Sequence, residues 1–277
     1  MDTTARNGKI AVFKYEKPDL DAIPRKRQTV WLGTTDRLFA TIQAHREGGE
    51  VKLHSHTHLD GFWYVLKGRV RFYSDETTVC ADMGPGQGVI VPRGEKYWFE
   101  AYGPEDLEIF QIECSDMAMT KEAARTERGV LDAGRRETAI AKFDYVPPAA
   151  ERAKTIVWLA RTDRLFATVQ VIARDGGETN LHSHAHLDGV WYVLEGRARF
   201  YSGETEMVAD MGPREGILIP RGERYWFESS GDVPLQILQV ECSDTPIGSR
   251  AELVSDRKDY TERTRREPTV HVGLPDF

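Results

Sequence analysis

The sequence predicts an all-β protein built from two tandem barrels. The segment LHSHTHLDGFWYVLKGRVRFYS at residues 53–74 returns as LHSHAHLDGVWYVLEGRARFYS at residues 181–202. Around both copies, short runs of β-branched and aromatic residues are separated by Gly and Pro turns, a pattern typical of short strands. The repeated parts contain no long helical period, so each half is predicted to form one small barrel or sandwich.

The repeat also sets the predicted domain boundaries. The lead-in sequence IAVFKY at residues 10–15 has a counterpart, IAKFDY, at residues 140–145. We therefore predict an N-terminal domain at residues 1–118 and a C-terminal domain at residues 140–246. The charged residues 119–139 contain many helix formers and predict a helical linker, and residues 247–277 predict a short helix followed by a tail.

Composition limits the kinds of partner. The chain has 277 residues, with 37 basic and 44 acidic side chains and a formal net charge of −7. This balance, with both signs interspersed, disfavours nucleic acid and anionic membranes as partners. The chain has neither an early apolar stretch like a signal peptide nor a long apolar run, so we expect a cytoplasmic protein with a small-molecule partner. The lead-in and the tail are segments through which a homodimer could form.

Histidines recur at alternate positions in both copies. Alternate residues of a strand share one face, with Cα atoms roughly 7 Å apart, so such a pair can grip one metal ion. The third histidine of each copy lies roughly 13 Å from the first along an extended strand, too far to share the ion unless the chain turns. It is better placed to orient a neighbouring group from outside the metal's own ligands. The predicted metal ligands are His54, His56, His182 and His184, and the predicted supporting residues are His58 and His186.

The spacing of these motifs resembles the cupin superfamily. Gly48, His54, His56 and Gly68 match its first signature, and the segment from Gly86 through Pro92 and Gly94 to Tyr97 matches its second. The second half repeats both signatures, so the chain resembles a two-domain bicupin. This resemblance implies two jelly-roll barrels, each a double-stranded β-helix, with short flanking helices. It also implies a metal held by two His and a Glu of the first signature and a His of the second.

Two positions depart from the family pattern, identically in both halves. The slot for the Glu holds Gly61 and Gly189, and an acid stands one residue earlier as Asp60 and Asp188. The slot for the second-signature His holds Tyr97 and Tyr225. The standard set of three His and one Glu is therefore excluded.

Aspartate and tyrosine are the candidates to complete each site. Asp60 and Asp188 have the ligand type of a two-His, one-carboxylate iron site, provided that a bulge turns them to the histidine face. Tyr97 and Tyr225 could bind the metal, hydrogen-bond a substrate or act as general acids. In the purely structural alternative, Gly61 only permits a bulge and Tyr97 only fills a pocket.

Three functions follow from these residues. The first is a metal-dependent enzyme, an iron dioxygenase or oxygenase acting on a small organic molecule, with Fe(II), Mn, Ni or Zn as the divalent metal. The second is a metal-free enzyme that resembles the sugar-nucleotide epimerases and ketoisomerases, in which His and Tyr serve as base and acid. The third is a storage or ligand-binding bicupin without chemistry.

Overall fold

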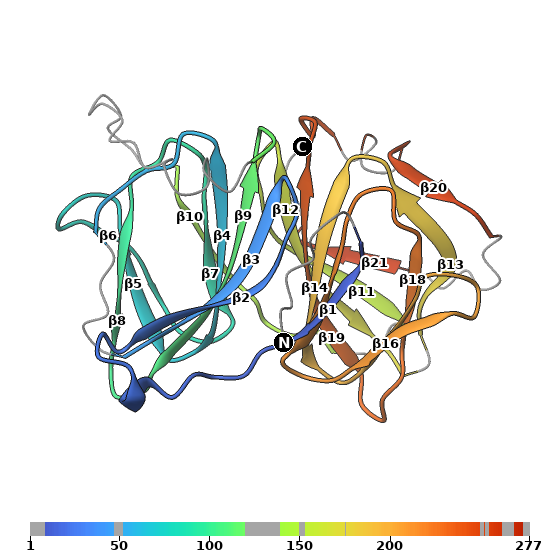
Figure 1. The fold of residues 1–277 in the computed structure, drawn as a ribbon, viewed down its shortest axis with the longest axis horizontal. Helices are drawn as coiled ribbons and strands as arrows, with labels where there is room; N and C mark the ends of the chain where they lie inside the picture. Colours follow the sequence, from blue (N-terminus) through green and yellow to red (C-terminus); the bar gives the residue numbers. More distant parts are fainter. Residues whose placement is uncertain are drawn as a thin grey trace. The chain divides into compact units, whose positions relative to one another are not determined.

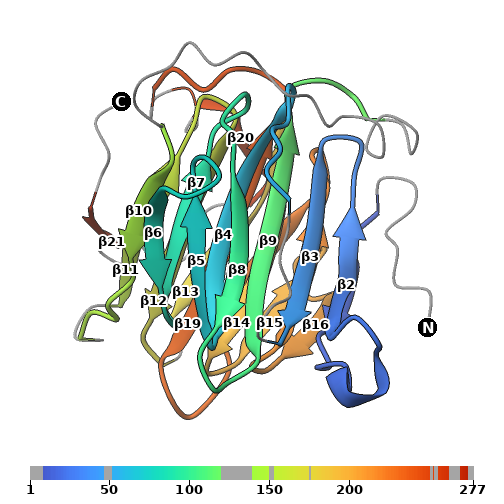
Figure 2. The same cartoon turned by 90° about the vertical axis from the view of Figure 1, so that its left-hand side faces the viewer.

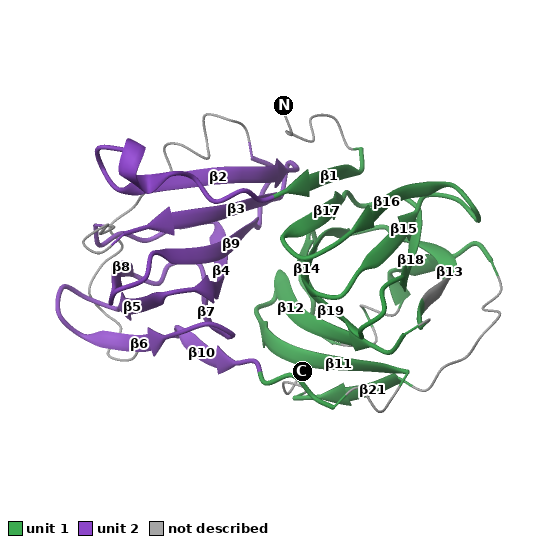
Figure 3. Ribbon diagram, turned by 90° about the horizontal axis from the view of Figure 1, so that it is seen from below, with its two compact units in different colours: residues 1–14, 146–277 green, residues 15–145 purple. Residues whose placement is uncertain are grey.

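Strands are the main secondary structure of the residues that the structure describes. The computed structural model describes residues 9–46, 52–119, 139–149, 153–174, 176–249, 252, 255–261 and 269–273. These residues form two compact units, residues 15–145 and residues 1–14 with 146–277 (Figure 3). Each unit contains one copy of the repeat, which confirms the predicted all-β fold with two barrels (Figure 1). No helix in the described parts of the chain is long and apolar enough to span a membrane.

The unit at residues 15–145 is formed by a large and a small sheet (Figure 2). The large sheet has the strand order β10-β7-β4-β9-β3-β2, and the small sheet has the order β6-β5-β8. The bounds are β2 Arg27–Thr34, β3 Leu38–His45, β4 Leu59–Lys67, β5 Arg69–Tyr73, β6 Val79–Met83, β7 Gln87–Val91, β8 Trp98–Tyr102, β9 Leu107–Ser115 and β10 Ala141–Asp144.

The second unit repeats this plan with additional edge strands. Its large sheet has the order β1-β17-β14-β19-β12-β11-β21, and its small sheet has the order β16-β15-β18-β13-β20. The bounds are β1 Ala11–Lys14, β11 Lys154–Arg161, β12 Leu165–Ile172, β13 Gly177–His184, β14 Leu187–Glu195, β15 Ala198–Tyr201, β16 Met207–Met211, β17 Glu215–Ile219, β18 Tyr225–Ser229, β19 Leu235–Ser243, β20 Arg257–Asp259 and β21 Thr269–Val272.

Aromatic side chains from both sheets form the core of each barrel. In the first unit, Trp63 of β4 lies 5.1 Å from Phe99 of β8, measured between ring centroids, and Phe99 stacks on Phe72 of β5 at 5.0 Å. Because alternate residues of β4 share a face, Val65 joins Trp63 in this core. The second unit has the equivalent core around Trp191, Phe200 and Phe227.

The two lead-in strands do not pair with the repeats that follow them. β1 pairs antiparallel with β17 of the second repeat, and β10 pairs antiparallel with β7 of the first repeat (Figure 3). The boundaries of the two compact units accordingly lie between residues 14 and 15 and between residues 145 and 146. The domains predicted from the sequence instead place each lead-in with the repeat that follows it.

The C-terminal residues form strands where a helix was expected. The described part of residues 247–267 contains one helical turn, in which the amide of Asp256 donates to the carbonyl of Glu252, followed by strand β20. Among the described residues of this segment, helix is limited to that turn. The tail forms β21, which pairs in parallel with β11. The predicted helical linker at 119–139, except for its end residues, and Gly48 lie outside the described residues.

A glycine in the neighbouring strand allows each lead-in strand to pack closely against its sheet. A Cβ on Gly88 would lie 2.1 Å from the carbonyl oxygen of Trp63 and 2.3 Å from Cζ of Phe143. A Cβ on Gly216 would lie 2.4 Å from the carbonyl oxygen of Trp191 and from Cζ of Phe13. Since one of the two obstructing atoms belongs to the backbone in each case, rotation of a side chain cannot make the space.

We predict that Gly88→Ala destabilises the protein by about 1–3 kcal/mol or more, the cost of overpacking a tight core contact. Gly84→Ala, in the preceding turn, is the matched control, because the nearest atom to its added Cβ would be 3.9 Å away. Urea unfolding of both variants measures the difference. Equal stability of Gly88→Ala and Gly84→Ala would contradict the role assigned to this glycine.

Candidate metal and ligand site

The first two histidines of each repeat are held opposite the tyrosine of the second signature. His54 and Tyr97 exchange two backbone hydrogen bonds, of 3.1 Å and 2.9 Å, in an isolated antiparallel bridge. In the second barrel, His182 of β13 stands opposite Tyr225 of β18. This pairing brings the tyrosine ring to the histidine ring, with centroids 4.5 Å apart in the first barrel and 4.3 Å in the second.

The two imidazoles of each pair lie side by side, as the strand alternation predicted. The rings of His54 and His56 are 5.0 Å apart and nearly perpendicular, at 88°. Those of His182 and His184 are 5.4 Å apart, at 89°. The structure therefore brings together four predicted metal ligands and the two predicted tyrosines, as one cluster of three rings in each barrel.

The first imidazole of each pair has a defined tautomer. Nδ1 of His54 lies 2.7 Å from the carbonyl oxygen of Lys52, and Nδ1 of His182 lies 3.0 Å from that of Asn180. A carbonyl only accepts hydrogen bonds, so Nδ1 carries the proton in the neutral ring and Nε2 carries the lone pair. This is the form in which imidazole binds metals.

Each histidine pair lines a cavity, of about 240 Å³ in the first barrel and about 400 Å³ in the second. Every residue that lines the first cavity has an equivalent that lines the second. The shared lining includes an aromatic pair at the open side, Trp31 with Phe39 and Trp158 with Phe166. The second cavity also receives Arg257 and His271 from the C-terminal strands.

A glutamate that the sequence did not indicate lies in each barrel, on the strand beside the glycine that stands at the family's Glu position. Gly61 pairs with Glu113 across β4 and β9, and Gly189 pairs with Glu241 across β14 and β19. Both glutamates line the cavities with the histidines. Their only sequence signal was the repeated QIEC and QVEC motif, and the strand register that aligns them with the glycines is a long-range property.

A chain of amides holds this glutamate in the first barrel. Nε2 of Gln111 donates to Oε1 of Glu113 at 2.7 Å, and Nε2 of Gln43 donates to Oε1 of Gln111 at 2.7 Å. In the second barrel, burial raises the pKa of the Glu241 carboxyl above its ordinary value, and the nearby His184 and a hydrogen bond from Gln239 lower it in part. Burial thus favours the neutral acid at Glu241.

The predicted aspartates and third histidines belong to a separate network. Both oxygens of Asp60, which is 1% exposed, accept hydrogen bonds from Arg93, at 2.7 Å from its amide and 3.0 Å from Nη1. Nε of Arg93 lies 3.4 Å from Asp116, which also contacts Nδ1 of His58 at 2.9 Å. Asp188, Arg221, Asp244 and His186 repeat this network.

Neither Asp60 nor His58 is among the residues that line the first cavity, and neither Asp188 nor His186 lines the second. The bulge that would turn Asp60 toward the histidines is absent, because Asp60 and Gly61 pair in continuous register with Cys114 and Glu113. The roles predicted for these four residues in the site stay predictions, and the described contacts place them in a network of ion pairs and hydrogen bonds.

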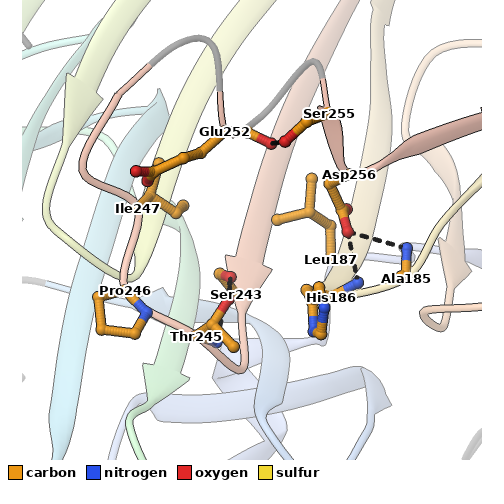
Figure 4. Close-up of a pocket in the computed structure, with 10 residues that line it drawn as sticks. All are labelled: Ala185, His186, Leu187, Ser243, Thr245, Pro246, Ile247, Glu252, Ser255 and Asp256. Carbon is orange, nitrogen blue, oxygen red and sulfur yellow. Dashed lines mark hydrogen bonds between the residues drawn. The ribbon is translucent and has the colours of Figure 1, made fainter.

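A carboxylate from the C-terminal segment lies beside the second histidine pair. Oδ2 of Asp256 lies 3.4 Å from Nδ1 of His184. Oδ1 of Asp256 accepts hydrogen bonds from the amides of Ala185 and His186, at 3.1 Å and 3.0 Å (Figure 4). These contacts line a further cavity of about 340 Å³ between the end of β13 and the C-terminal segment. The composition around Asp256 predicts a helix and carries no signal for this contact.

The donor atoms suit a divalent metal in type. Each cavity offers two imidazoles and one glutamate, the set of a two-His, one-carboxylate site. Among the described residues, however, no group of three or more His, Cys, Asp or Glu side chains is close enough to hold an ion. Each site therefore has two imidazoles side by side. In the first barrel the glutamate, Glu113, hydrogen-bonds with Gln111 and does not join them as a third ligand.

The comparisons with known proteins agree with the repeat and the fold. The family model described as "Cupin domain" matches residues 41–113 and 169–241. Among curated proteins, mannose-1-phosphate guanylyltransferase 2 of Escherichia coli O157:H7 is 31% identical over 80 residues, which are 28% of this chain and 16% of that protein. The chain thus spans about a sixth of that relative's length.

Solved structures with the same fold include two named enzymes. Salicylate 1,2-dioxygenase from Pseudoaminobacter salicylatoxidans aligns with a TM-score of 0.62 at 11% identity, covering 87% of this chain and 82% of that one. Oxalate decarboxylase from Bacillus subtilis aligns at 0.53 and 15% identity, covering 88% and 76%. Protein YlbA from E. coli aligns at 0.56 and 13% identity, covering 86% and 93%. At these identities the likeness is one of fold.

We predict that Arg93→Met destabilises the protein by about 3–5 kcal/mol, because it leaves the buried Asp60 carboxylate without its cation. Arg71→Met is the matched control: its partner Asp82 is 37% exposed, so its loss costs at most about 1 kcal/mol. The double variant Asp60→Asn with Arg93→Met should recover part of the loss. Urea unfolding measures all three, and a loss for Arg93→Met no larger than that of the control would contradict the structural role.

Proposed function

The chain belongs to the cupin family, and on that premise we propose that it is a metal-dependent enzyme with one site in each barrel, an Fe(II) dioxygenase acting on a small organic molecule. The observation that carries the proposal is the paired imidazoles, which lie about 5 Å apart in both cavities. In each pair the first ring is fixed by a backbone carbonyl in the tautomer that binds metals.

In this proposal His54, His56 and Glu113 hold the metal in the first barrel, and His182, His184 and Glu241 hold it in the second. The carboxylate replaces the Glu of the family pattern from the neighbouring strand, since Glu113 pairs with Gly61 at the empty slot. Glu113 must exchange its contact with Gln111 for the ion. A bound Fe(II) supplies a Lewis acid and a redox centre for dioxygen.

The chain's own residues orient the substrate and move protons. Tyr97 is buried beside His54, and its phenol can give a proton to a substrate oxygen or hold that oxygen by a hydrogen bond. The aromatic pairs at the open side exclude water from a planar molecule. Among proteins with the same fold, salicylate 1,2-dioxygenase supports the reaction class by its name, and oxalate decarboxylase supports a divalent metal through its Mn(II) centres.

One observation favours a second function. Because no three-ligand group is assembled in the described residues, the same His and Tyr could act without metal, as base and acid on a carbon next to a carbonyl. Chelation separates the two functions: activity that survives complete removal of metal belongs to the acid–base enzyme.

The first test is the metal content of the protein purified without added metal. We expect about one equivalent of iron or another divalent ion per barrel, and about half of that after His54→Ala with His56→Ala. His58→Asn is the control and should keep its metal, because His58 contacts Asp116 outside the cavity. Less than a tenth of an equivalent per barrel, with no uptake of added Fe, Mn, Ni or Zn, would reject the proposal.

A second test uses the carboxylate that contacts the second histidine pair. We predict that Asp256→Asn weakens metal binding in the second barrel about 10- to 100-fold, because a carboxylate 3.4 Å from Nδ1 of His184 makes that imidazole a stronger metal ligand than a neutral amide would. The measurement is metal titration of the His54→Ala, His56→Ala background, in which the second barrel binds alone. Asp232→Asn, at a fully exposed position, should leave the affinity unchanged. An unchanged affinity in Asp256→Asn would show that this contact does not tune the ligand.

A further inference from the structure

One indole in each barrel has an unsatisfied buried donor. Trp63 and Trp191 are both 1% exposed, and Nε1 of each is buried without a hydrogen-bond partner in the described residues. The fold does provide partners for other indoles: Trp98 donates to the carbonyl of Asp75 at 2.7 Å, and Trp226 donates to that of Gly203 at 2.8 Å. A buried N–H without an acceptor is costly, and phenylalanine would fill the core without this cost.

Both indoles stand at the glycine that replaces the family's glutamate. A Cβ on Gly61 would lie 3.1 Å from Nε1 of Trp63, and a Cβ on Gly189 would lie 2.4 Å from the benzene edge of Trp191. Each tryptophan also lines the cavity that contains its histidine pair. The ring edge that faces the glycine differs between the barrels, with Nε1 toward Gly61 and the benzene edge toward Gly189, and the donor lacks a partner among the described residues in both.

The charge of the cavity wall indicates what such a donor would bind. β2 begins with Arg27 and β11 begins with Lys154, and both residues line their cavities. Both barrels thus have a basic residue at this position, and Lys154 is only 3% exposed. Two residues further along, Thr29 of the first lining is replaced by Ile156 in the second. The glutamate is the acidic side chain of each lining, and hydrogen bonds from its neighbouring glutamine hold it.

We propose that each cavity binds a planar organic carboxylate, and that the indole N–H of Trp63 or Trp191 donates to an oxygen of that ligand. The basic residue at the start of β2 or β11 supplies the opposite charge, and the aromatic pair at the open side contacts the planar body. Trp63 and Trp191 then determine specificity, because a ligand without an oxygen at that place leaves their indole N–H groups without a hydrogen-bond acceptor. The inference rests on the proposed function in that it takes the two cavities as substrate sites.

The test follows the indole protons directly by NMR of the full chain labelled with ¹⁵N-tryptophan. The chain has six tryptophans, so six indole signals are expected, and Trp63→Phe and Trp191→Phe assign the two of interest. Benzoate is the probe and benzyl alcohol is the uncharged control. We titrate each into chelator-treated protein and into protein loaded with diamagnetic Zn(II).

We expect benzoate to shift the Trp63 and Trp191 signals downfield in at least one of the two forms, and benzyl alcohol to shift them much less. Trp63→Phe with Trp191→Phe should weaken benzoate binding about tenfold, the effect of losing one hydrogen bond to a charged acceptor. Trp98→Phe, whose indole is already bonded to Asp75, should bind as the unmodified protein does.

Two results would overturn the inference: unshifted Trp63 and Trp191 signals in both forms, as expected if water alone satisfies the donors, or equal shifts by benzoate and benzyl alcohol. These outcomes are separate from the metal test. A protein that binds metal but shows no indole shift fails only here, and one that binds benzoate without holding metal fails only the proposed function.

Discussion

The antiparallel register of β4 on β9, and of β14 on β19, decides what stands beside the two imidazoles. It places Gly61 opposite Glu113 and Gly189 opposite Glu241. The glycine provides the space that an indole occupies, and the glutamate brings a carboxylate to the same cavity from the next strand. A slip of one residue would turn β4 over and send Asp60, now paired with Arg93, to the cavity face. The buried ion pair of Asp60 and the contents of the cavity are thus two consequences of one register.

The sequence was sufficient for the features that depend on neighbouring residues. The side-by-side placement of His54 and His56 followed from strand alternation, and the two barrels followed from the repeat. Tyr97 came from its place in the second signature, and the structure pairs it directly with His54.

The remaining parts of the site depend on contacts between distant segments. Glu113 is brought to Gly61 by strand pairing, and Asp60 reaches Arg93 because β4 pairs with β7. The charged, helix-forming composition around Asp256 predicted a helix. The residues that follow it instead form β20, which pairs with β13. Local propensity is a weak guide where the edge of an existing sheet can add a strand.

The lead-in strands carry a consequence for the evolution of the two repeats. β1 completes a sheet made by the second repeat, and β10 completes one made by the first, each seating a phenylalanine on a glycine of that sheet. A gene fragment cut between the repeats would therefore encode a barrel whose large sheet lacks one edge strand. The same fragment would carry the lead-in strand that belongs to the other barrel. Each repeat thus depends on a strand that is encoded next to the other repeat.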